Sequence, residues 1–113
     1  MKYLTITINN LKWKVYFVKN GDSHLEQNEN EQNVCGITHF SDLKIYINKD
    51  INYDLIKRTI RHELTHAYLF SYGLGQYETF TEENVCDIVE TYGNDICLHT
   101  DLIMDEFERG ANG

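Results

Sequence analysis

The stretch His62-Glu63-Leu64-Thr65-His66 places two histidines four residues apart, with a glutamate directly after the first. Residues four apart on an α-helix lie one turn above each other on the same face. His62 and His66 can therefore direct two imidazoles at one point, and Glu63 lies beside them. Two neutral imidazoles that bind zinc, with a carboxylate that handles the proton of a bound water, make a hydrolytic metal site. The pattern predicts such a site on a helix.

The residues around these histidines have the spacing of an amphipathic helix. Either Asp50 or Asn52 can cap it, and the helix is expected to begin near Tyr53. It is expected to end near Tyr72-Gly73, because glycine favours a helix end. The two histidines thus fall in mid-helix, where their spacing has the required geometry. The residues on the core side are Leu55, Ile56, Thr59, Ile60, Leu64, Ala67 and Tyr68.

A β-hairpin is expected at the start of the chain. Residues 3–8 and 12–18 are rich in β-branched and aromatic side chains, and Asn9-Asn10 lies between them as a turn signal. A short helix over residues 11–18 is the alternative. The N-terminal segment has no long apolar run or small-residue cleavage site, so it indicates a strand rather than a signal peptide.

A second strand pair is expected at residues 34–39 and 43–48. In residues 43–48 apolar side chains alternate with polar ones and a tyrosine, which predicts one buried and one solvent-exposed face. The polar segment 19–33 has no periodicity and predicts a loop.

Two further helices are expected after the histidine helix. Thr81 is followed by two glutamates, which is typical of an N-cap and first turn, and an apolar stripe continues to Gly93-Asn94. A last helix is expected over about 95–108. Because strands precede helices, the fold class is predicted to be α+β. We expect a small antiparallel or mixed sheet of three to four strands, packed on the histidine helix and a glutamate-bearing helix, in one domain over residues 1–113.

Charge and cysteine content limit the function classes. The formal net charge is −8, which disfavours nucleic acid as a partner, because that binding depends on basic residues that neutralise phosphates. No segment approaches the roughly 18 apolar residues of a membrane span. The three cysteines include no C-x-x-C pair, which favours buried thiols and a reducing cytoplasm.

A catalytic zinc usually takes three protein ligands and a water. A third histidine in the pattern H-E-x-x-H-x-x-G-x-x-H is excluded, because Leu69 and Tyr72 occupy the last two defined positions. The other zinc-peptidase arrangement takes a glutamate from the following helix, which favours Glu83. Asp87 follows one turn later on the same face and can accept the free ring N–H of a ligating histidine. The competing ligands are Glu82 and, more distantly, Glu90.

The predicted chemistry is hydrolysis by a zinc-activated water. Glu63 is expected to take the proton of that water and pass it to the leaving amine. A further donor to the oxyanion is also expected. The sequence does not choose among its candidates, which are Tyr92, His99, His39 and Tyr77.

Residues 59–69 (TIRHELTHAYL) and 81–87 (TEENVCD) resemble the small gluzincin-type metallopeptidases of the ImmA/IrrE family, often carried by phages and mobile elements. The resemblance covers roughly residues 34–93 and implies a minimal zincin fold. Family members cleave a repressor protein. This chain departs from the family in having no helix-turn-helix and no proline after the glutamate. The resemblance implies zinc bound by His62, His66 and Glu83, with Glu63 as catalytic base.

The leading hypothesis is a zinc-dependent endopeptidase that cleaves a protein substrate, such as a repressor or other regulator of a mobile element. The strand Leu43–Asn48 is expected to lie at the sheet edge and to pair with an extended peptide. One alternative is a zincin-like metal-binding module that binds a partner protein without cleaving it. Another is a structural metal site that His99 closes as a fourth ligand. The sequence leaves the oligomeric state open.

Overall fold

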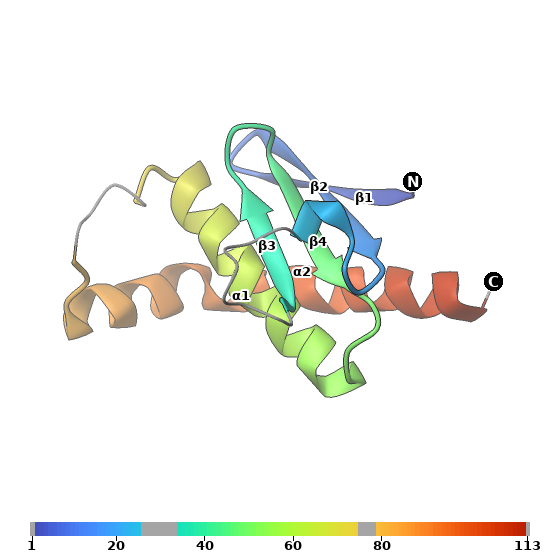
Figure 1. The fold of residues 1–113 in the computed structure, drawn as a ribbon. Coiled ribbons are helices and arrows are strands. Elements are labelled where there is room, and N and C mark those ends of the chain that lie inside the picture. The colour runs from blue at the N-terminus through green and yellow to red at the C-terminus, as the bar shows by residue number, and fades with distance from the viewer. Residues whose placement is uncertain (1, 26–33, 75–78, 113) are drawn as a thin grey trace.

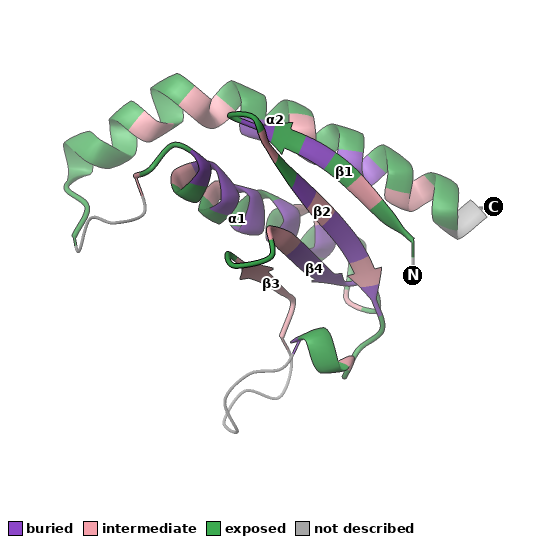
Figure 2. Cartoon of the chain, turned by 90° about the horizontal axis from the view of Figure 1, so that it is seen from above, coloured by how far each residue is buried: buried purple, intermediate pink, exposed green. Residues whose placement is uncertain are grey.

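The computed structural model describes residues 2–25, 34–74 and 79–112. It forms a four-stranded mixed sheet with two long helices on one face, which confirms the α+β class (Figures 1 and 2). None of the helices in the described ranges is both long and apolar enough to cross a membrane. The elements are β1 (Tyr3–Ile8), β2 (Leu11–Val18), the 3-10 turn η1 (Ser23–Leu25), β3 (Gly36–His39), β4 (Lys44–Asn48), α1 (Tyr53–Ser71) and α2 (Glu82–Asn112).

Strands β1 and β2 form the predicted hairpin, and the alternative of a helix over residues 11–18 is wrong. Asn9 and Asn10 both have positive φ (48° and 67°), a conformation that asparagine tolerates better than most residues and that suits a tight hairpin turn. The hairpin is tied to the end of α1. Asn9 Nδ2 donates to the Ser71 carbonyl oxygen at 2.8 Å, and Trp13 Nε1 donates to Ser71 Oγ at 2.9 Å.

The strand order is β1-β2-β4-β3, so β4 lies inside the sheet. It pairs in parallel with β2 on one side and antiparallel with β3 on the other. The prediction that Leu43–Asn48 forms the edge strand is therefore wrong, because the first hairpin adds to its free side. The prediction of one solvent-exposed face is also wrong, since Tyr46 and Asn48 are buried. The edge strand beside α1 is β3.

Alternation along the strands divides the buried residues between the two faces of the sheet. Trp13 and Val15 of β2 and β4 residues Ile45 and Ile47 face the helices. They pack against the apolar side of α1 and against α2 from Ile96 onward; the buried residues of these helices are Ile56, Ile60, Leu64, Ala67, Tyr68, Ile96, Ile103 and Met104. On the opposite face, Leu25 of η1 covers a smaller cluster with Tyr16, Val18 and Tyr46.

Both helices begin at the predicted caps. Asn52 Oδ1 accepts from the Asp54 amide at 2.9 Å at the start of α1. At the start of α2, Thr81 Oγ1 accepts from the Asn84 amide, and Asn84 Oδ1 accepts from the Thr81 amide. These reciprocal bonds satisfy amides that have no partner within a helix.

The prediction of two helices separated at Gly93-Asn94 is wrong. Helix α2 is continuous over 31 residues, and Gly93 does not adopt the positive φ of a helix-ending glycine. Beyond this point Ile96, Thr100 and Ile103 remain buried. We attribute the continuous helix to these core contacts, which outweigh the local preference of Gly93-Asn94 for a helix end.

Candidate metal centre

Helix α1 places the two motif histidines on one exposed face. The ring centroids of His62 and His66 are 5.0 Å apart, and the ring planes are inclined by 72°. Both side chains are exposed, whereas Glu63 and Leu64 between them are buried. This follows from the helical period, because positions 62 and 66 share one face while 63 and 64 point toward the sheet and core. Both imidazoles are thus accessible from the solvent side.

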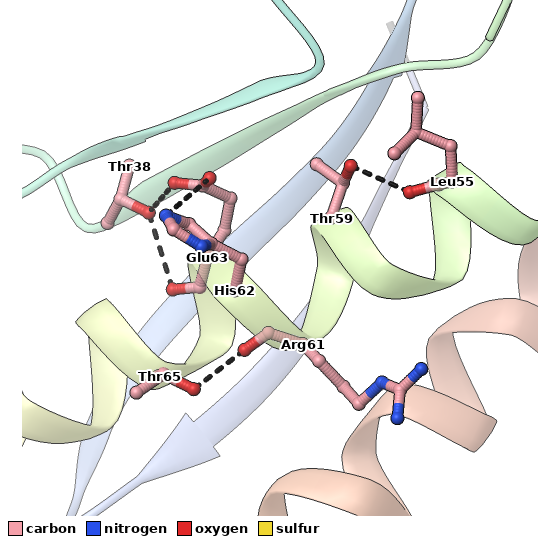
Figure 3. Close-up of polar contacts among 7 residues, drawn as sticks. All are labelled: Thr38, Leu55, Thr59, Arg61, His62, Glu63 and Thr65. Atoms are coloured by element: carbon pink, nitrogen blue, oxygen red, sulfur yellow. Dashed lines mark hydrogen bonds and ion pairs between the residues drawn. The ribbon is translucent and has the colours of Figure 1, made fainter.

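The carboxylate of Glu63 lies between α1 and β3 (Figure 3). Thr38 Oγ1 donates to Glu63 Oε1 at 2.8 Å, and it also lies 3.3 Å from the Glu63 carbonyl oxygen. The other carboxylate oxygen, Oε2, is 3.9 Å from His62 Nε2. One oxygen is therefore held by the edge strand, and the other faces the histidine that is predicted to bind metal.

The sequence reasoning missed Thr38 as a site residue. The only signal was alternation in β3, where Gly36 and Thr38 share a face. That face is turned to α1: a Cβ added at Gly36 would lie 2.7 Å from Thr59 Cγ2 and 3.2 Å from Glu63 Cγ. The absence of a side chain at Gly36 lets β3 approach α1 closely, and Thr38 then reaches the carboxylate.

The predicted third ligand lies in the first turn of α2. Glu83 is exposed, as are Glu82 in the same turn and Asp87 and Glu90 in the following turns. Helix α2 packs against α1 further along, where the rings of Tyr92 and His99 contact Tyr68, while its first turns project past α1 (Figures 1 and 2). Within residues 2–25, 34–74 and 79–112, no group of three or more His, Cys, Asp or Glu side chains could hold a metal ion. The structure thus brings together His62, Glu63 and His66 but adds no third ligand to them, and Glu83 stays a prediction.

The predicted oxyanion donors have other contacts. His99 Nδ1 and the Tyr68 hydroxyl are hydrogen-bonded at 2.6 Å between the two helices, and the ring of Tyr92 packs on Tyr68 and Tyr72. Burial, followed by the charge of nearby Asp95, raises the pKa of Tyr68 to about 12, so this hydroxyl keeps its proton. His39 lies edge-on to Tyr46. Tyr77 lies outside the described residues.

Two phenylalanines beside the histidines were also missed. The Phe40 ring is 6.3 Å from the His66 ring and 5.2 Å from the Phe70 ring, measured between centroids. Phe70 in turn makes an edge-to-face contact with Trp13 in the core. Phe40 follows β3 directly and Phe70 lies near the end of α1, so only the tertiary structure brings them to His66.

Comparisons with known proteins gave no match: no protein-family model, no curated protein and no solved structure matches this chain. The resemblance to the ImmA/IrrE metallopeptidases therefore rests on the residues of this sequence alone. The function has to be inferred from what the side chains at this site can do chemically.

Proposed function

We propose that this protein is a zinc-dependent metallopeptidase with a zincin-like site centred on α1. The observation that carries the proposal is the pairing of two exposed imidazoles, 5.0 Å apart, with the buried carboxylate of Glu63 beside them. Imidazole is a preferred ligand of Zn²⁺. The two histidines can occupy two coordination positions of a zinc ion. We assign the third to Glu83, and this assignment requires the first turns of α2 to approach α1.

In this proposal each side chain has a separate task. His62 and His66 hold the ion, which when bound lowers the pKa of a water molecule toward ~7 and polarises the scissile carbonyl. Glu63 would receive the proton of the attacking water at Oε2 and pass it to the leaving amine. Thr38 donates to Oε1 at 2.8 Å and thereby holds the carboxylate in one orientation.

The substrate is an extended segment of a protein, bound at the edge of the sheet. Of the two edge strands, β1 and β3, it is β3 that lies beside α1, and Thr38 on it contacts Glu63. A peptide that pairs with the free edge of β3 would pass beside the histidines, which corrects our expectation that residues 43–48 pair with it. By resemblance, we propose a repressor or other regulator of a mobile element as the protein cleaved.

The test is Glu63→Gln, which keeps the shape of the side chain but removes its basicity. We expect this variant to retain zinc, measured by metal analysis of the purified protein, and to lose roughly 10²–10⁴-fold in cleavage rate. Casein, an unfolded protein, serves as a general substrate, and product peptides are identified by mass spectrometry. Glu106→Gln is the control, because Glu106 is exposed on α2 and pairs with Arg109. Normal cleavage by Glu63→Gln would show that the assigned base is wrong.

A second candidate is a zincin-like module that binds a partner protein without cleaving it. One observation favours it: the exposed rings of Phe40 and Phe70 lie beside His66, where they could contact a partner protein without any cleavage. A module of this kind would bind the same partner as wild type and as Glu63→Gln, and neither protein would yield cleavage products. A wild-type protein that releases peptides, while Glu63→Gln only captures the intact partner, decides for the enzyme.

A further inference from the structure

Two large aromatic side chains are exposed next to the proposed metal site. Phe40 and Phe70 are each 42% exposed, and their rings contact each other beside His66. Phenylalanine is usually buried, and an exposed aromatic pair next to a candidate active site is typical of a binding surface. Phe70 also rests on the buried Trp13, so this part of the pair has a rigid support.

The alternation of β3 continues into this pair. Gly36 and Thr38 face α1, over Thr59 and Glu63. Phe40, two residues after Thr38, contacts His66 and Phe70 further along the same helix. The contact between β3 and α1 is therefore polar at Thr38 and Glu63 and becomes aromatic at Phe40 and Phe70.

We propose that Phe40 and Phe70 form an apolar subsite, which receives a large apolar side chain of the substrate next to the bond that is cleaved. This inference rests on the proposed function and adds a substrate class to it: extended protein segments with Phe, Leu or a similar residue beside the scissile bond. A peptide paired with β3 brings its side chains past Glu63 and then past Phe40. The two rings offer apolar contact and no charge, so an acidic or basic side chain at this position loses its hydration without a partner.

The test measures binding apart from catalysis. Zinc-loaded Glu63→Gln protein is titrated by calorimetry with synthetic peptides of one extended sequence, whose central residue is Phe, Leu or Asp. We expect the Phe and Leu peptides to bind roughly tenfold more tightly than the Asp peptide. Adding Phe40→Ala should remove most of this preference, because it should weaken the binding of the Phe and Leu peptides and leave the binding of the Asp peptide unchanged. Leu98→Ala is the control, because Leu98 is an exposed apolar residue of α2.

Cleavage by the wild-type protein completes the test, with the same peptides and product sites read by mass spectrometry. Equal cleavage or binding of the Phe and Asp peptides would overturn the subsite but leave the peptidase intact. Binding that depends on Phe40, with no cleavage by wild type, would support the subsite and reject the peptidase. If none of the peptides binds, or if Phe40→Ala binds them all as before, the subsite is wrong and the pair only packs the β3–β4 turn onto α1. Loss of a dimer in Phe40→Ala, measured by light scattering, would assign the pair to contact with a second copy of the chain and overturn the proposal.

Discussion

Gly36 is the residue whose size decides how closely the edge strand lies to the histidine helix. A Cβ at this position would lie 2.7 Å from Thr59 Cγ2, which is closer than packed atoms tolerate, and 3.1 Å from the backbone carbonyl oxygen of Tyr46, which is a tight contact. The hydrogen bond from Thr38 to Glu63 depends on the same approach. One missing side chain thus supports the position of the proposed catalytic base.

We expect Gly36→Ala to lower the free energy of unfolding by about 1–3 kcal/mol, because the added methyl group overpacks the contact between β3 and α1. Urea denaturation followed by circular dichroism measures the change. Gly110→Ala is the control and should not lose stability, since a Cβ there meets nothing within 4 Å and alanine suits the helix. If Gly36→Ala is as stable as wild type, the close approach of β3 to α1 is wrong.

At the scale of elements, the length of α2 decides where the predicted third ligand lies. One continuous helix over Glu82–Asn112 keeps its direction from its contacts with the core back to its first turns. A break at Gly93-Asn94 would let the segment with Glu83 turn toward α1. The Gly93-Asn94 pair favours a helix end, whereas the tertiary contacts beyond it favour a continuous helix. The helix is continuous, and Ile96 and Ile103 beyond the glycine are buried.

Gly93→Ala tests this continuity. In a helix interior alanine is favoured over glycine by about 0.5–1 kcal/mol, and the new Cβ would make ordinary contact with Val89 Cγ1 at 3.4 Å. We therefore expect a higher free energy of unfolding, measured by urea denaturation. Gly73→Ala should have the opposite sign, because Gly73 has a φ of 73° after α1. A loss of stability in Gly93→Ala would instead support a helix end at this position.

At the scale of the whole molecule, zinc binding joins the two helices if Glu83 is the third ligand. An ion that binds the folded state alone stabilises it by mass action, by about 2.7 kcal/mol at a free concentration 100 times the Kd. If α1 supplies two ligands and α2 the third, as proposed, this stabilisation would also depend on the position of the first turns of α2.

We expect zinc to raise the melting temperature of wild type, to have no effect on His62→Ala, and to have a smaller effect on Glu83→Ala. Differential scanning fluorimetry across a zinc titration measures these shifts, and Glu82→Ala is the matched control from the preceding residue. A full zinc effect in Glu83→Ala with a reduced one in Glu82→Ala would reassign the ligand. A full zinc effect in both variants would show that neither Glu82 nor Glu83 binds the ion.

The sequence by itself determined the features that depend on near neighbours in the chain. These are the first hairpin, the caps at Asn52 and Thr81, and the helix that presents His62 and His66 on one face. Helical period, turn chemistry and capping act over a few residues, so local patterns predict them.

Only the tertiary structure decided which distant segments meet. It placed β4 inside the sheet, put β3 at the sheet edge beside α1 and continued α2 through Gly93. It also brought Thr38 to Glu63 and Phe40 to His66, pairs that are 25 and 26 positions apart in the chain. Such contacts depend on burial and strand pairing between remote segments, and the order of residues within one segment does not specify them. The placement of His62 and His66 on one helix face could therefore be predicted from their spacing. The contacts of Thr38 and Phe40 around them could not.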